Sequence, residues 1–188
     1  MITEKFDPYI LFIQGFRNTE VIDPEKVLKD LRTAFPELAL QLLRADRIAG
    51  KEHLLFAAKN AVGSFDGKDR RAKHLSMEFL LFASGEHQII EAVKLLGVSS
   101  STTELVVTGL CKTRPDLDLL STEVAKMVNG VPDDSVIDFQ EPKKIIGLKK
   151  AFKISDKEMD SALVPGETKE TVLKRLVIER SALLALEN

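Results

Sequence analysis

The stretch YILFIQGFR, residues 9–17, is the feature that most constrains the fold of this chain. It is almost continuously apolar and ends at Gly15, Arg17 and Asn18. An apolar run of this length that is rich in β-branched and aromatic residues is typical of an interior strand. We therefore expect a sheet that has this strand inside it.

A helix is predicted directly after this strand. Asp23 is a good N-cap, Pro24 suits the first helical position, and the charge of Glu25 complements the positive end of the helix dipole. Apolar residues follow at helical spacing, and Pro36 ends the helix.

The rest of the chain intermixes expected helices and strands. Helices are expected at 51–65, 68–85, 86–97, 120–130 and 169–186. Strands are expected at 103–110 and 134–139, and 142–154 reads as a helical turn that leads into a strand. The segment 37–50 is ambiguous between strand and helix, and the alternation of Leu38, Leu40 and Leu42 favours a strand. The fold class is therefore α/β (mixed α+β): residues 1–188 form a single domain, in which helices flank a central mixed sheet and a long helix ends the chain.

Composition and charge exclude several classes of protein. Hydrophobic residues make up 44% and charged residues 30% of the chain, which excludes intrinsic disorder. A net charge of −2 predicts no bulk affinity for nucleic acid or membrane. Cys111 is the only cysteine, so neither an intramolecular disulfide nor a thiolate metal site is possible within the chain. No apolar run approaches the ~20 residues of a membrane span, and we expect a cytoplasmic protein without metal or cofactor.

No segment carries a convincing catalytic motif. The loop GSFDGKD, residues 63–69, has its glycines too close together for a phosphate-binding P-loop, and Asp69 stands where a hydroxyl is needed. The three histidines, His53, His74 and His87, show no metal-ligand spacing. One alternative remains open, a small α/β enzyme with a site around Arg71, His74, Ser84 and His87.

The near-neutral total charge hides two basic stretches. Residues 51–74 hold six Lys or Arg against three acids, and residues 143–157 hold six Lys against Asp156 alone. Such stretches can be solvated helix faces or surfaces that contact a phosphate backbone.

The last expected helix has more apolar residues than one stripe requires. They cover more than half of its circumference: Val172, Leu173, Leu176, Val177, Ile178, Leu183, Leu184 and Leu186. This helix must therefore either lie deep in the core or meet a second partner, and the sequence leaves both alternatives open.

The segment LSMEFLLFASGEHQIIEAVKLLGV, residues 75–98, resembles the kinase-binding subunit of the KEOPS complex, the TPRKB-like family. The shared pattern is an L-S-x-E helix, a Ser-Gly turn, the sequence x-x-Q-I-x-E-A, and a closing Gly-hydrophobic pair. The segments around Ala49–Ala61 and LVIERSALLAL, residues 176–186, are similar to helices of the same family. One departure is His87, where many archaeal members have Arg.

This resemblance implies a non-catalytic subunit of the machine that makes threonylcarbamoyladenosine in ANN-decoding tRNAs. Its direct partner would be a Bud-type atypical kinase/ATPase, which would link it indirectly to the KEOPS transferase subunit, and archaeal-type members also bind the tRNA CCA end. The implied tRNA-binding residues are Lys59, Arg70, Arg71, Lys73, Ser84, Gly85, His87, Gln88 and Ile89. The implied kinase-docking helix is 168–187, with Val172, Leu173, Leu176, Val177, Arg180, Leu183 and Leu184 as its contact residues. No catalytic residue, metal or cofactor is implied, and no membrane is involved.

Overall fold

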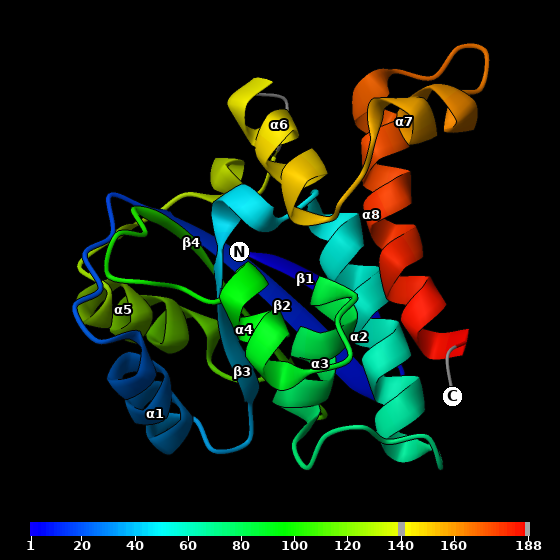
Figure 1. The fold of residues 1–188 in the computed structure, drawn as a ribbon. Coiled ribbons are helices and arrows are strands. Elements are labelled where there is room, and N and C mark those ends of the chain that lie inside the picture. Colours follow the sequence, from blue (N-terminus) through cyan, green and yellow to red (C-terminus); the bar gives the residue numbers. More distant parts are fainter. Residues whose placement is uncertain (139–141, 187–188) are drawn as a thin grey trace.

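A five-stranded antiparallel sheet forms the centre of the molecule in the computed structural model, which describes residues 1–138 and 142–186 (Figure 1). The strand order is β1-β2-β4-β3, and β5 pairs with the end of β2. The strands are β1 (Ile2–Phe6), β2 (Tyr9–Arg17), β3 (Ala39–Arg44), β4 (Glu104–Cys111) and β5 (Val131–Pro132). The apolar run 9–17 is β2 and lies between β1 and β4, which confirms the predicted interior strand.

Helices cover both faces of the sheet (Figure 1). On β2, Leu11 and Ile13 join the core beneath α2 (Lys51–Asp66), α3 (Leu75–Ser84) and α8 (Lys169–Leu186). Phe12 and Phe16 point to the opposite face, where α1 (Pro24–Ala34) and α5 (Leu117–Met127) pack. A strand covered on both faces must be apolar at nearly every position, which explains the unbroken run in the sequence. The mixed α/β fold with a flanked sheet and a long C-terminal helix is confirmed.

The residues that were expected to start the helix after β2 do so in α1. The Asp23 side chain accepts a hydrogen bond from the Lys26 amide at 3.0 Å, and Pro24 occupies the first helical position. Of the other expected elements, 37–50 contains β3 and the short 3₁₀ helix η1 (Ala45–Arg47), and 86–97 contains α4 (Ile89–Leu96). The last helix, α8, is confirmed within the described residues, and residue 187 of the expected docking segment lies outside them.

Three details of the prediction are wrong. The sheet is not mixed in strand direction, because every strand pairing in the described residues is antiparallel. The expected strand 134–139 is instead the 3₁₀ helix η2 (Asp134–Ile137). Residue 139, the last residue of the expected strand, lies outside the described part of the chain. Asp133 caps this helix by accepting the Ser135 amide at 2.9 Å, and Asp134 links it to β2 by accepting the Gly15 amide at 2.9 Å. The segment 142–154 contains the helix α6 (Pro142–Ala151), and no strand follows it in the part of the chain that the structure describes.

The helix expected over 68–85 begins only at Leu75. The buried Glu78 carboxylate accepts the Ala72 amide at 2.6 Å and the Arg71 amide at 3.0 Å, which holds the preceding residues in a loop. The strand β1 and the helix α7 (Asp156–Ala162) had no counterpart in the prediction.

No helix in the described residues is both long and apolar enough to cross a bilayer. The same residues contain no group of three or more His, Cys, Asp or Glu side chains that could hold a metal ion.

Candidate nucleic-acid and protein interfaces

The corner between α3 and α4 has a fixed backbone and an exposed, chemically varied surface. Gly85 ends α3 with φ +66°, and a Cβ at this position would lie 3.0 Å from the Cβ of Arg180. Glycine is therefore required both by the left-handed conformation and by the close approach of α8. His87, Gln88 and Ile89 follow on the surface.

Gln88 occupies the N-cap position of α4, but its side chain makes no capping hydrogen bond. The Gln88 side chain is therefore not used as a helix cap. An amide side chain offers both a donor and an acceptor. Beside it, the first backbone amides of α4 have no partner within the helix, and the Ile89 side chain is 40% exposed. This corner can bind a polar, planar group that also presents an apolar face.

Ser84 supports this corner from inside. Its side chain is 3% exposed, its hydroxyl donates to the Leu81 carbonyl at 2.9 Å, and it accepts the Glu86 amide at 3.2 Å. The Ser84 hydroxyl is thus held by one backbone group before it and one after it in the chain. Its role is therefore to fix the shape of the corner.

Arg71 joins the loop before α3 to the last helix. Its guanidinium donates to the Leu184 carbonyl at 2.7 Å and lies 5.4 Å from the centre of the Phe82 ring. The residue is half-buried, and its backbone amide is bound by Glu78. Ser64 donates a further hydrogen bond to the Glu78 carboxylate at 2.6 Å. Arg71 therefore has a structural role, in which it joins the loop before α3 to α8.

The other predicted basic residues are exposed. The Arg70 guanidinium lies 4.2 Å from the centre of the Phe65 ring, and its Nε donates to the Ala72 carbonyl at 2.7 Å. The Lys59 ammonium lies 6.0 Å from the Phe56 ring, which is 48% exposed. A cation beside an exposed aromatic ring can bind a phosphate while the ring stacks on a base. Sequence analysis missed these aromatic partners, although the i, i+3 spacing of Phe56 and Lys59 could have indicated them.

The predicted tRNA-binding residues fall into separate groups along α3. Arg70 and Lys73 precede its first residue, whereas Gly85, His87 and their neighbours follow its last. The ten residues of α3 span about 15 Å. A ligand that meets both groups must therefore reach over about 15 Å.

The alternative enzyme site does not assemble. His74 caps the start of α3, and Ser84 ends the same helix, so their backbones are separated by its length. The Ser84 hydroxyl is also held by backbone groups rather than by a base. Arg71, His74, Ser84 and His87 therefore do not form one catalytic arrangement.

The last helix uses most of its apolar residues inside the domain. Those with at most 4% exposure are Val172, Leu173, Leu176, Val177 and Leu184. They pack in the core shared with α2 and α3, which explains why apolar residues cover more than one stripe. Leu183 at 41% exposure and Leu186 at 79% remain at the surface. Arg180 is half-buried and pairs with Glu158 at 2.6 Å.

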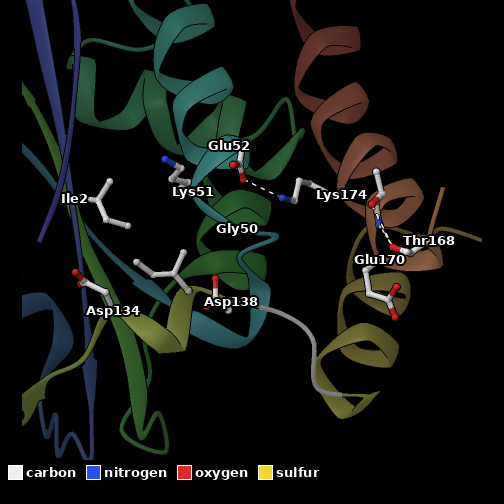
Figure 2. Close-up of a pocket in the computed structure, with 11 residues that line it drawn as sticks. Ile2, Gly50, Lys51, Glu52, Asp134, Asp138, Thr168, Glu170 and Lys174 are labelled. Atoms are coloured by element: carbon white, nitrogen blue, oxygen red, sulfur yellow. Dashed lines mark hydrogen bonds and ion pairs between the residues drawn. The ribbon is translucent and has the colours of Figure 1, made fainter. Parts of the chain in front are cut away.

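A cleft of about 600 Å³ lies between the starts of α2 and α8, and it was not expected from the sequence (Figure 2). Its cations are paired with carboxylates: Lys174 with Glu52 at 3.0 Å, and Lys51 with Glu4 at 3.4 Å. The pKa of the Glu52 carboxyl group is lowered. Burial alone would raise this pKa, but the hydrogen bond from its own backbone amide and the nearby Lys174 ammonium stabilise the carboxylate and outweigh that effect. Acids outnumber bases in the lining of this cleft, since Glu52, Asp134, Asp138 and Glu170 face only Lys51 and Lys174, so it does not favour an anion.

Comparison with known proteins places these features in a sequence family. The family described as "Kinase binding protein CGI-121" matches residues 18–185. The regulatory protein Cgi121 of Methanocaldococcus jannaschii is 32% identical over 117 residues, which cover 62% of this chain and 72% of that protein. The family match includes the α3–α4 corner and nearly all of α8.

Proposed function

Because the chain belongs to the CGI-121 family of kinase-binding proteins, we propose that it is a non-catalytic subunit of a KEOPS-type complex. It binds the Bud-type kinase/ATPase directly and recruits tRNA by its 3′ CCA end, and the kinase links it indirectly to the transferase subunit. The complex then makes threonylcarbamoyladenosine in ANN-decoding tRNAs. The observation that carries this proposal is the family match over 168 residues, from 18 to 185.

The α3–α4 corner supports recognition of an unpaired RNA end. Single-stranded RNA is read by stacking its bases and by hydrogen bonds to their edges. Ile89 and His87 offer faces for stacking, Gln88 offers a donor and an acceptor, and the first amides of α4 suit a phosphate. The rigid left-handed turn at Gly85 keeps these groups in one arrangement before RNA arrives.

The basic residues before α3 extend this contact. In our proposal Lys59, Arg70 and Lys73 contact phosphates, whereas Arg71 and Ser84 hold the surface in shape. The separation along α3 suits the three unpaired nucleotides at the end of tRNA, which form an extended chain. Each phosphate contact adds a salt-sensitive increment to the affinity.

The exposed part of α8 supports kinase docking. Leu183 and Leu186 present apolar surface on a helix whose other leucines and valines are buried, and Arg180 lies on the same helix. The buried apolar residues of this helix contribute to docking indirectly, because they hold α8 in position. They are Val172, Leu173, Leu176, Val177 and Leu184. A partner that covers Leu183 would desolvate a side chain already fixed on a rigid helix, which favours binding.

The experiment that tests kinase docking uses a matched pair of variants. Leu183→Glu places a charge in the proposed interface, and Leu119→Glu places the same charge on α5, where Leu119 is 50% exposed on the other face of the sheet. We expect Leu183→Glu to weaken calorimetric binding of the kinase by ~100-fold or more, because the charge becomes buried in the complex. Leu119→Glu should bind as the wild type does. Equal affinities of the two variants would contradict docking through this face of α8.

Function as a subunit is tested by turnover. The isolated chain should not hydrolyse ATP or modify tRNA, and it should stimulate both reactions when it is added to the kinase and the transferase. Turnover by the isolated chain would contradict a non-catalytic role.

A further inference from the structure

Helix α6 carries a charge pattern that helix stability does not explain. It contains four lysines, Lys143, Lys144, Lys149 and Lys150, and no acid. Cations near the end of a helix interact favourably with its dipole, but cations in the first turn do so unfavourably. Lys149 and Lys150 therefore suit their positions, whereas Lys143 and Lys144 do not.

Two of these lysines have structural partners. The Lys144 ammonium donates to the carbonyls of Val136 at 2.7 Å and Asp138 at 2.8 Å, and it thereby caps η2. Lys149 pairs with Asp156. Lys143 and Lys150 are exposed and have no ion pair among the described residues.

The two unpaired lysines lie on one face of the helix. Lys143, Ile146 and Lys150 have i, i+3, i+7 spacing, which brings them into line on the surface. Ile146 is 68% exposed between the two cations. This face therefore presents two ammonium groups on either side of an apolar side chain.

Lys153 lies two residues beyond the end of α6 and breaks a second local rule. Its φ is +54°, and the amides of Lys153 and Ile154 donate back to the carbonyls of Lys150 and Lys149. This is the helix-ending position at which glycine is usual and a side chain is strained. The Lys153 side chain is 83% exposed, and its ammonium lies 3.8 Å from Glu86. It thus reaches the α3–α4 corner, one residue before His87.

We propose that Lys143, Lys150 and Lys153 form a second nucleic-acid surface, which contacts backbone phosphates of the RNA whose end occupies the α3–α4 corner. The inference rests on the proposed tRNA recruitment and extends it to a surface that contacts the paired part of the molecule. Lys143 in the first turn of α6 and Lys153 at a positive φ each depart from a local rule, and such departures are expected at functional sites. A row of cations that ends beside the corner would hold the adjoining strand through its charge, independently of its sequence.

The test compares RNA binding by the triple variant Lys143→Gln, Lys150→Gln, Lys153→Gln with that of the wild type in the full chain. The probes are an ANN-decoding tRNA transcript and the same transcript without its last three nucleotides. Each lost phosphate contact lowers the slope of log affinity against log salt by about 0.7–0.9, so the triple variant should lose about 2–3 from that slope. Its affinity should fall by ~10-fold or more at 0.1 M salt, and by the same factor for both transcripts.

The control variant, Lys26→Gln, Lys29→Gln, Lys126→Gln, makes an equal change of charge on α1 and α5, beyond the sheet. Equal losses in the control and α6 variants would overturn the inference. This result is distinguishable from a failure of CCA recognition, which would appear as equal affinity of the wild type for the two transcripts. Absence of any tRNA binding by the wild type would overturn both proposals.

Lys153→Gly gives a second readout, in which stability and binding move in opposite directions. Glycine adopts the left-handed conformation without strain, so the urea midpoint of unfolding should stay the same or rise. Loss of the ammonium should weaken tRNA binding several-fold and lower its salt slope by about 0.7–0.9. Unchanged binding by Lys153→Gly would remove Lys153 from the surface.

Discussion

His53 predicts a specific pH dependence of folding stability. Its ring is fully buried, Nδ1 accepts the Ala49 amide at 3.3 Å, and Nε2 lies 2.7 Å from the Ala83 carbonyl, to which the neutral ring donates. The ring also meets the Phe152 ring edge-on, with 5.6 Å between the centres. One neutral imidazole therefore joins the start of α2 to the end of α3, directly beside the Gly85 corner.

Burial lowers the pKa of His53 from 6.5 to about 4, because a buried imidazolium loses its hydration, and the Ala83 carbonyl offsets this only in part. The unfolded chain then binds a proton that the folded chain excludes as the pH falls from about 6.5 to about 4. Stability from this group is complete above pH 6.5 and declines on acidification through that window. At 1.36 kcal/mol for each pH unit of difference, the total is ~3 kcal/mol, of which ~2 kcal/mol is lost by pH 5.

The assay is urea unfolding, followed by circular dichroism, at intervals from pH 7.5 to pH 4.5. His53→Gln replaces the imidazole by an amide that can still hydrogen-bond but cannot be protonated. Its free energy of unfolding should be lower at pH 7.5, because the ring packing on Phe152 is lost, and should fall less steeply below pH 6.5, because no buried group is left to take up a proton. His74→Gln, at an exposed histidine, is the control and should follow the wild type. If the wild type and His53→Gln lose the same free energy between pH 7 and pH 5, the reasoning about a neutral buried imidazole is refuted.

Three further predictions concern the stability of the fold. Glu78→Ala leaves the loop amides unpaired and should cost ~2–3 kcal/mol in urea unfolding, and trypsin should then cut the loop before α3 faster than in the wild type. Gly15→Ala should cost ~2 kcal/mol or more, because its Cβ would lie 2.3 Å from the Asp133 carbonyl oxygen, whereas Gly63→Ala has open space in a helix and should raise stability by ~0.5–1 kcal/mol. Leu176→Glu should unfold the domain, since Leu176 is 4% exposed, while Leu183→Glu should keep the wild-type circular dichroism spectrum; a folded Leu176→Glu would contradict the position of α8.

The elements that the sequence predicted well are those with strong local signals. The run 9–17 is apolar because β2 is covered on both faces, and the Asp23-Pro24 pair starts α1 through a side-chain cap. The end of the expected helix 68–85 is confirmed as well, since Gly85 ends α3 in the left-handed conformation. In each case a few adjacent residues determine the local structure, so pattern and structure agree.

The elements that were missed depend on contacts between distant residues. The loop before α3 is helical by its sequence pattern, but buried Glu78 captures its amides and Arg71 bonds to Leu184 in the last helix. The turn η2 replaces the expected strand because Asp134 bonds the Gly15 amide, 119 residues earlier in the chain. Such long-range hydrogen bonds have no short sequence signature, and tertiary structure overrides local propensity where they form.

The candidate site was predictable in composition and not in arrangement. The sequence indicated the basic stretches and the exposed turn at Gly85–Ile89, both of which lie on the surface. The sequence could not distinguish the roles of Arg70 and Arg71, because both occur in one run of charges. Arg71 makes a structural hydrogen bond to Leu184, whereas Arg70 stacks on Phe65. That distinction depends on where α8 and the end of α2 lie.

Recognition of the tRNA end is the central claim, and one titration tests it most directly. The wild-type chain is titrated at low salt with an intact ANN-decoding tRNA and with the same tRNA lacking its CCA end. Stacking and base-edge contacts should make the intact tRNA bind ~10-fold or more tightly, at ~1–3 kcal/mol for each stacked base, and Gln88→Ala should remove most of that difference. Equal affinity of the wild type for the two RNAs would contradict the account.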